Sequence, residues 1–317
     1  MPPSPSWRRS CSVTRDLLEI DDLTPAELGR LLDTARKWKA DPSAVPRALA
    51  GRGVALVFEK PSARTRTSAE MAAYLLGGHP IAIRAEEVGI DTRETAEDVA
   101  RTLAGFCAVI AARVFDHGVL VRMAAAVEVP VVNLLSDVAH PCQALADLMT
   151  IGEVFGGVEG RRVAFVGDGN NVAASLAYGA ALTGFELIVS SPPGYELDEH
   201  LVDRARNLGG AIELVADPNE AVRDVDVVYT DVWTSMGEED EAEARREVFN
   251  AWRVGPELMD QAGSGAVFMH CLPAHRGEEV AADVIDGPAS VVWQQVENRM
   301  HTKRALFAWL VSAQEVV

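Results

Sequence analysis

The residues best suited to chemistry in this chain stand in the segment 58–67, Phe-Glu-Lys-Pro-Ser-Ala-Arg-Thr-Arg-Thr. The segment follows an apolar, strand-like run at 53–58 and opens a helix-like run at 68–76. A helix that begins there would direct free backbone N–H groups and a planar guanidinium at one point, which is how proteins bind phosphate. A capped helix with solvated arginines is the alternative, and the strand-then-helix order makes a phosphate site an equally good interpretation.

Polar residues also follow most of the later strand-like runs, at the point where each run ends. They are Arg113, His140, Asp168, Asn171, Asp231, His270 and Cys271. Open parallel sheets bind ligands beyond the carboxyl ends of their strands, so we expect these side chains to gather around a ligand. A structural role explains any one of them, but it poorly explains polar residues at the ends of so many successive strands.

The run at 162–166 is followed by Gly167-Asp168-Gly169-Asn170-Asn171, a pattern that invites a dinucleotide-binding interpretation. The third glycine of that fingerprint is missing, and the next strand, at 185–190, ends without an acidic residue for a ribose. We therefore reject a dehydrogenase-type nucleotide site.

Five short motifs occur in order along the chain. They are Ser62-Ala63-Arg64-Thr65, His140-Pro141-Cys142-Gln143, Asp231-Val232-Trp233-Thr234-Ser235-Met236-Gly237, His270-Cys271-Leu272-Pro273 and Glu297-Asn298-Arg299. Together they resemble the signature of the carbamoyltransferases, and the last three resemble the ornithine carbamoyltransferase branch. The resemblance covers roughly residues 17–310. Each motif alone is weak, but five in the right order are very specific.

The resemblance implies which residues bind the two substrates. Carbamoyl phosphate would be bound by Ser62, Ala63, Arg64, Thr65, Arg113, His140, Gln143, Cys271, Leu272 and Arg299. L-Ornithine would be bound by Asn171, Asp231, Ser235 and Met236, and the catalytic residues would be Arg113, His140, Asp231, Cys271 and Arg299. These are suitable residue types, because a planar guanidinium matches phosphate oxygens and donors aimed at a carbonyl oxygen stabilise the charge that grows there.

The same resemblance implies the reaction and its setting. The carbamoyl group would pass from carbamoyl phosphate to the δ-amine of L-ornithine, giving L-citrulline and phosphate, with no cofactor and no metal. This transferase reaction belongs to arginine metabolism and amino-acid biosynthesis. The family is commonly trimeric, so a homotrimer or a multiple of trimers is expected.

Two other functions are considered. One is a carbamoyltransferase for another amine, such as putrescine or a modified ornithine, although the loop at 231–237 favours ornithine itself. The other is a paralogue that binds these ligands without turnover. Every charged catalytic position of the family pattern is filled, which argues against that alternative.

Cys271 has three possible roles. An isolated cysteine after a strand is most often a packing residue. A nucleophilic thiol with His270 or His275 as its base is conceivable, but direct attack by the amine does not need one. A zinc site of His270, Cys271 and His275 lacks a further ligand pair at familiar spacing.

The sequence departs from the family pattern in two places. Ala63 stands where the family usually has threonine, so one hydroxyl is missing from the phosphate loop. The segment 86–94 is longer and more acidic than the family loop that reaches a neighbouring subunit, with Arg93 as its obvious cation.

Length and composition set further limits. A chain of 317 residues with 48% hydrophobic and 24% charged residues suggests two globular domains. The net charge of −18 argues against a nucleic-acid partner and requires that cationic groups for an anionic substrate be gathered in a cleft. Residues 1–12 lack the apolar core of a signal peptide, no run is long enough to span a membrane, and the four cysteines are widely spaced. We expect a cytoplasmic protein with no membrane association.

Elements that could position these residues can be read from the apolar pattern. Strand-like runs lie at 53–58, 80–84, 107–111, 130–134, 162–166, 185–190, 211–215, 225–229 and 266–269, with a shorter one at 290–293. Helical patterns separate them, beginning with a helix capped by Thr24, Pro25 and Glu27 and including a long segment at about 141–155. The alternation predicts an α/β protein of two doubly wound parallel-sheet domains.

A final amphipathic helix is predicted from Val296 to about Val311. By the resemblance, this C-terminal helix returns to the first domain. Residues 1–148, together with a C-terminal helix at 299–317, would form the carbamoyl phosphate-binding domain, and 149–298 the ornithine-binding domain.

Overall fold

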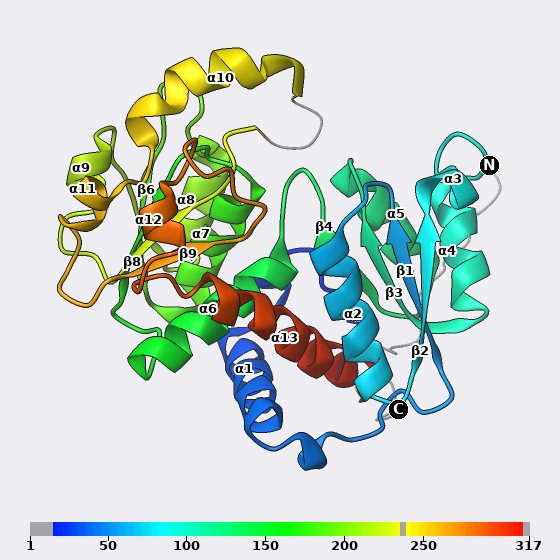
Figure 1. Ribbon diagram of the computed structural model, residues 1–317. Helices are drawn as coiled ribbons and strands as arrows, with labels where there is room; N and C mark the ends of the chain where they lie inside the picture. Colours follow the sequence, from blue (N-terminus) through cyan, green and yellow to red (C-terminus); the bar gives the residue numbers. More distant parts are fainter. Residues whose placement is uncertain (1–14, 235–238, 313–317) are drawn as a thin grey trace.

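The computed structural model describes residues 15–234 and 239–312 (Figure 1). Two parallel sheets form separate lobes, as the alternation predicted. The first sheet has the order β2-β1-β3-β4, with β1 Gly53–Phe58, β2 His79–Arg84, β3 Cys107–Arg113 and β4 Val131–Leu135. The second has the order β7-β6-β5-β8-β9, with β5 Arg162–Val166, β6 Glu186–Ser190, β7 Ala211–Leu214, β8 Val227–Thr230 and β9 Val267–His270.

Helices cover both sheets. Those around the first are α1 Pro25–Ala40, α2 Ala63–Leu75, α3 Ala85–Val88, α4 Ala96–Ala104, α5 His117–Ala126 and α6 Pro141–Phe155. Those after α6 are α7 Asn171–Thr183, α8 Glu199–Asn207, α9 Pro218–Ala221, α10 Ala242–Phe249, α11 Pro256–Met259, α12 Ala282–Ile285 and α13 Val292–Ser312. None of the described helices is long and apolar enough to cross a membrane.

The topology places a crevice at the carboxyl ends of the strands in each sheet. In the first, β1 lies between β2 and β3, and in the second, β5 lies between β6 and β8. The chain order reverses at these central strands, and such switch points open a crevice at the carboxyl ends of the strands. The segment after β1, the end of β3 and the segment after β8 therefore meet the space between the lobes.

Helix α1 begins as its sequence predicts. The Thr24 side chain accepts a hydrogen bond from the Glu27 backbone N–H, and Glu27 Oε2 accepts one from the Thr24 backbone N–H at 2.9 Å. One face of α1 is apolar and packs on the core. Trp38 is partly buried there, and four residues are fully buried: Leu28, Leu31, Leu32 and Ala35. The core they join includes residues of α6, α7 and both sheets, so apolar packing is continuous from one lobe to the other.

The predicted strand at 290–293 is wrong. Ser290 makes only an isolated bridge to Phe268, and α13 begins at Val292, four residues before the predicted start. Val292 is buried as the first residue of that helix, so the apolar run reflects packing of a helix end. The predicted return of the C-terminal helix is confirmed, because α13 packs on α1, α2 and α6 (Figure 1).

Candidate active site

The start of α2 forms one wall of the site. Ser62 is its N-cap, and Ser62 Oγ accepts a hydrogen bond from the Thr65 backbone N–H at 3.3 Å. Helix geometry leaves the first backbone N–H groups without acceptors inside the helix, so those of Ala63 and Arg64 remain for a ligand. The start of α2 therefore offers backbone donors to an anion.

Three arginines from three elements carry the positive charge of the site. Arg64 lies on α2, Arg113 ends β3, and Arg299 lies on α13. Each has a buried Nε atom without a hydrogen-bond partner, and within residues 15–234 and 239–312 none of them pairs with a carboxylate. Arg113 and Arg299 are buried and Arg64 is half-buried. Guanidinium groups with spare donors and no counterion are suited to an anion with several oxygens.

The charges are close enough to affect one another. Burial, followed by the charges of Arg299 and Arg64, lowers the pKa of Arg113 to about 10. Arg113 stays protonated at neutral pH, but its charge is unfavourable while the site holds no anion. The arrangement therefore favours binding of a negatively charged group.

His140 and Gln143 stand at the start of α6, facing this charge. Burial, followed by the charges of Arg299 and Arg113, lowers the pKa of His140 well below the ordinary histidine value, so the ring is neutral at neutral pH. His140 Nδ1 and Gln143 Oε1 are both buried without a partner among the described residues. A neutral imidazole and an amide oxygen offer a ligand hydrogen bonds without adding charge.

Asp231 and Cys271 come together at the ends of β8 and β9. Cys271 Sγ donates to Asp231 Oδ1 at 2.8 Å, and Asn170 Nδ2 donates to Asp231 Oδ2 at 2.9 Å. Burial, followed by the charge of Asp231, raises the pKa of Cys271 well above the ordinary thiol value. The site thus holds a buried carboxylate beside a neutral thiol, which suits a cationic or amine group.

Arg299 joins the two lobes within the site. Its Nη2 donates to Thr65 Oγ1 at 3.0 Å, and its Nη1 donates to the Cys271 carbonyl oxygen at 3.3 Å. One side chain from α13 therefore contacts the helix start after β1 and the loop after β9. The structure brings the motifs at both ends of the chain into one place.

His270 stabilises the loop that carries Cys271. Its Nδ1 accepts from the Leu272 backbone N–H at 2.9 Å, and its Nε2 lies 3.2 Å from Glu279 Oε1, which fixes Nε2 as the protonated nitrogen. Leu272 has a positive φ of 61°, an uncommon conformation for a residue with a branched side chain. Both ring nitrogens of His270 are occupied.

Two alternatives for this loop are disfavoured by that geometry. His270 has no free nitrogen to act as the base of a nucleophilic Cys271 or as a ligand of the zinc site considered above. The side chain of His275 is 53% exposed, and its Nδ1 lies 3.7 Å from Oε2 of Glu279, the same carboxylate that contacts His270.

Two residues singled out in the sequence, Asn171 and Asp168, have protein partners that the sequence did not indicate. Asn171 Nδ2 donates to the Ser136 carbonyl oxygen at 2.6 Å, whereas its neighbour Asn170 contacts Asp231. Asp168 forms an ion pair with Arg245 at 3.0 Å. The predicted ornithine-binding residues Ser235 and Met236 lie outside the described residues.

A cavity of about 490 Å³ lies beside these asparagines. It is lined by residues of both lobes, among them Glu19, Asp137, Asn170, Asn171 and Arg204. Asn171 therefore lies where a polar ligand could reach it from the space between the lobes.

Sequence reasoning missed several supporting residues: Asp147, Asn170, Glu279 and Gln295. Asn170 had a signal, since its position just before a helix after a strand is that of an N-cap, which it proves to be. Asp147 had one as well, since it follows Gln143 by four residues on the same helix face. Glu279 and Gln295 reach the site only through tertiary packing.

Comparison with known proteins agrees with this geometry. Residues 15–153 match the family model described as aspartate/ornithine carbamoyltransferase, carbamoyl-P binding domain, and residues 159–310 match that family's Asp/Orn binding domain. The chain belongs to the aspartate/ornithine carbamoyltransferase family.

Several family members are similar over nearly their whole length. The ornithine carbamoyltransferase of Acidothermus cellulolyticus is 48% identical over 305 residues, covering 95% of this chain and 98% of that protein. A Pyrococcus furiosus relative named as anabolic is 48% identical over 300 residues, covering 93% of this chain and 95% of that protein. The solved structure of ornithine carbamoyltransferase from Pyrococcus furiosus superposes with a TM-score of 0.89 at 47% identity, covering 93% of this chain and 96% of that one. The two-lobed fold with a C-terminal helix is thus shared with this family.

Proposed function

We propose that this chain is an ornithine carbamoyltransferase, which transfers the carbamoyl group of carbamoyl phosphate to the δ-amine of L-ornithine and releases L-citrulline and phosphate. One observation carries the proposal: two buried guanidinium groups, Arg113 and Arg299, and the half-buried Arg64 have no carboxylate partner among the described residues and lie beside a buried carboxylate–thiol pair. The first feature fits a phosphate and the second fits an amine. The relatives named ornithine carbamoyltransferase support the choice of substrates.

The phosphate is assigned to the helix start and the arginines. Ser62, the backbone of Ala63, Arg64, Thr65 and Arg113 would bind its oxygens. This assignment is supported by the open N–H groups at the start of α2 and by the unpaired Nε atoms of Arg64 and Arg113. Guanidinium groups that are already in place stabilise charge without reorganising during the reaction.

The carbamoyl group is assigned to the start of α6 and its neighbours. His140 and Arg299 would donate to the carbonyl oxygen, where negative charge grows on attack. Gln143 and the backbone of Leu272 would bind the amide. The neutral ring of His140 is suited to donation, because it brings no second positive charge to the arginine cluster.

Attack proceeds directly from the amine in this proposal. The δ-amine must first lose its extra proton, since only the neutral form has a free electron pair. That pair forms the new C–N bond, the C–O bond to phosphate breaks, and one further N–H proton leaves, for which the departing phosphate is the nearest base. Asp231 and Cys271 would orient the amine, and Asn171, Ser235 and Met236 would bind the α-amino and α-carboxylate groups.

The domain roles follow the same assignment. Residues 1–148, with the C-terminal helix at 299–317, would form the carbamoyl phosphate-binding domain, and residues 149–298 the ornithine-binding domain. The extents of the two family models, 15–153 and 159–310, support a division near this point.

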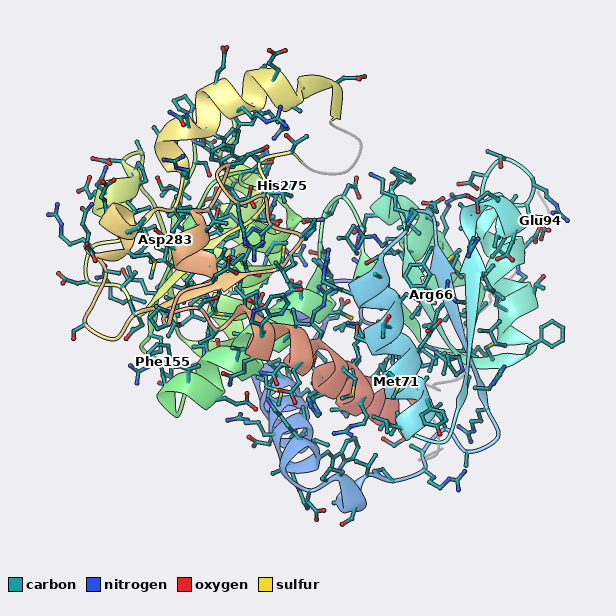
Figure 2. All side chains as sticks on the ribbon, viewed as in Figure 1. Arg66, Met71, Glu94, Phe155, His275 and Asp283 are labelled. Carbon is teal, nitrogen blue, oxygen red and sulfur yellow. The ribbon has the colours of Figure 1, made fainter. Side chains whose placement is uncertain are left out.

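We also propose a homotrimer, or a multiple of trimers, working in the cytoplasm in arginine biosynthesis. An apolar patch on the first lobe supports self-association: Met71, Tyr74, Leu75 and Ile81 are all exposed on α2 and β2, with Tyr74 at 65%. Figure 2 shows Met71 on α2 of this lobe. The name of the anabolic relative supports the biosynthetic direction.

A substrate panel tests the proposal. Carbamoyl phosphate is incubated with ornithine, lysine, putrescine, acetylornithine or aspartate, and ureido products are measured. We expect citrulline to form from ornithine at least ten times faster than any other product forms. The Arg64→Ala variant loses a charge-assisted contact, so its rate of citrulline formation should be at least a hundredfold lower. Preference for another amine, or binding of both ligands without any product, would contradict the proposal.

A further inference from the structure

Asp147 is a fully buried carboxyl group on which three elements converge. Its Oδ1 accepts from Gln143 Nε2 of the same helix, α6, at 2.8 Å, and from Gln295 Nε2 of α13 at 2.6 Å. Its Oδ2 accepts from the Tyr229 hydroxyl of β8 at 3.2 Å. None of the substrate-binding roles proposed above uses Asp147.

The contact to Gln143 decides which end of that amide faces the ligand. An amide carries a donor end and an acceptor end, and the acceptor Asp147 takes the donor end. Gln143 Oε1 is therefore turned the other way, and it is buried without a partner in the part of the chain that the structure describes. A flipped amide would place two oxygens against each other and would lose the 2.8 Å hydrogen bond.

Gln143 Oε1, the oxygen without a partner, can only accept a hydrogen bond. In carbamoyl phosphate the phosphate oxygens, when ionised, and the carbonyl oxygen are acceptors, and only the NH₂ group donates. Acetyl phosphate has a methyl group at that position and is otherwise nearly the same shape. A correctly turned Gln143 therefore distinguishes these two acyl phosphates.

We propose that Asp147 is a positioning residue that turns the Gln143 amide oxygen toward the carbamoyl NH₂ group and so makes the site selective for carbamoyl phosphate over acetyl phosphate. The inference rests on the proposed function, since it takes carbamoyl phosphate as the ligand. Because Asp147 also accepts from Gln295, whose Oε1 accepts from the His270 backbone N–H at 3.0 Å, its orientation is set by β9 as well as by α6.

The orientation does not depend on the ionisation of Asp147. Burial raises the pKa of Asp147 to about 7. A proton on the neutral acid would sit on Oδ2, where the Tyr229 oxygen can accept it, and Oδ1 would still accept from both amides. The only described side chains in hydrogen-bond contact with Asp147 are Gln143, Gln295 and Tyr229.

The test compares dissociation constants of carbamoyl phosphate and acetyl phosphate, measured by ligand-dependent thermal shift so that turnover is not needed. The variants are Asp147→Ala, Gln143→Ala and the double variant, with Asp147→Asn as the conservative replacement. Thr150→Val is the matched control, because Thr150 is also buried on α6 and accepts from Asn298 of α13 at 2.9 Å, but does not contact Gln143.

The acetyl-to-carbamoyl ratio of dissociation constants should fall about tenfold in Asp147→Ala, the value of one hydrogen bond. Gln143→Ala should show the same fall and the double variant no further one, because Asp147 acts through Gln143. Asp147→Asn, which can keep an oxygen toward Gln143, and Thr150→Val should both retain the ratio. If Asp147→Ala does not fold, Asp147→Ser replaces it, since serine is too short to reach Gln143.

The inference would be overturned if Asp147→Ala raised the dissociation constants of both ligands equally. It would also be overturned if the ratio of dissociation constants fell further in the double variant than in either single variant, or if Asp147→Asn lost the ratio. Failure of the proposed function has a different signature. In that case the unmodified protein makes no citrulline or does not bind carbamoyl phosphate, whatever the ratio among the variants.

Discussion

The thiol of Cys271 donates a hydrogen bond to Asp231 Oδ1 at 2.8 Å, and both side chains are buried. The direction of this bond matters, because a proton held between sulfur and carboxylate keeps the sulfur uncharged. A thiol is a far weaker nucleophile than a thiolate. The pair is therefore suited to binding an amine, which agrees with direct attack.

The state of Cys271 gives the first prediction. Because burial and Asp231 raise its thiol pKa well above the ordinary value, iodoacetamide should alkylate Cys271 at pH 8 at least ten times more slowly than a cysteine in an unfolded peptide. Cys271→Ser should keep measurable citrulline formation, since a hydroxyl can also donate to Asp231. Mass spectrometry follows the alkylation, and a trapped carbamoyl-Cys271 would show covalent catalysis instead.

The second prediction concerns Asp231. Asp231→Asn removes the negative charge that would hold the δ-amine, so the Michaelis constant for ornithine should rise at least tenfold, while the dissociation constant of carbamoyl phosphate should change less than about threefold. Activity of the unmodified protein should rise with pH through the neutral range, because a free δ-amine has a pKa near 10, as lysine does. Loss of carbamoyl phosphate affinity with normal ornithine use would contradict this assignment.

The third prediction concerns the repulsion among the arginines. Burial lowers the pKa of Arg113 to about 10, well below the ordinary value of an arginine, so folding disfavours its charged form at every pH below about 10. In the absence of ligand, Arg113→Met should therefore raise the melting temperature. The gain in the free energy of unfolding should be on the order of 2–3 kcal/mol. The same change should remove most of the rise in melting temperature that phosphate gives the unmodified protein.

Arg66→Met is the matched control for that experiment. Arg66 lies on α2, the helix that carries Arg64 (Figure 2), but it pairs with Glu70 at 2.7 Å on the surface. Its loss should leave the phosphate-dependent shift unchanged. If Arg66→Met and Arg113→Met respond alike to phosphate, the arginine cluster is not the anion site.

The fourth prediction concerns Lys303, a fully buried lysine on α13. Its Nζ donates to Ser68 Oγ at 3.0 Å and to the Arg299 carbonyl oxygen at 3.4 Å. Burial, followed by the charge of Arg299, lowers its pKa from 10.5 to about 7. Between these values the unfolded chain holds a proton that the folded chain does not, so the Lys303 contribution to stability rises with pH from about 7 to 10.5.

Lys303→Met should remove that pH dependence. The variant should be more stable than the unmodified protein at pH 7, by about 3 kcal/mol after allowing for the lost hydrogen bonds. The difference should shrink as the pH approaches 10. Urea unfolding at pH 7, 8.5 and 10 measures the difference in free energy of unfolding between the variant and the unmodified protein. If this difference stayed constant or grew with pH, Lys303 would be charged in the folded state.

The fifth prediction concerns Ala63, the first residue of α2. Its backbone N–H survives any side-chain change, and a hydroxyl adds roughly 0.5–1.5 kcal/mol when it makes a net hydrogen bond. Ala63→Thr should therefore change the Michaelis constant for carbamoyl phosphate by at most about tenfold in either direction. An inactive natural chain that regains turnover through Ala63→Thr would instead identify a protein that binds these ligands without catalysis.

Sequence reasoning predicted best where the information is local. The capping box of Thr24 and Glu27 depends on neighbours three residues apart, and it is present as predicted. The central strands of each sheet are continuous apolar runs, a pattern typical of parallel strands buried on both faces. Polar residues at strand ends gather because parallel strands share one edge.

What the sequence did not predict depends on contacts between distant segments. The run at 290–293 is apolar enough for a strand, but packing makes Val292 the first residue of α13. The contact of Asn170 with Asp231 was not predicted, because it joins the start of α7 to the end of β8, two segments far apart in the sequence. Gln295 joins Asp147 to His270 over more than a hundred residues of chain, without any local signal.

The position of Arg299 so late in the chain has a consequence for biosynthesis. Both sheets are complete by His270, so a growing chain can fold each of them before its last segment has been made. The third guanidinium arrives only with α13, the last described helix, which must settle against α1, α2 and α6 after they have formed. A chain that stops before α13 would thus have both sheets folded but would lack Arg299, so we expect it to be inactive.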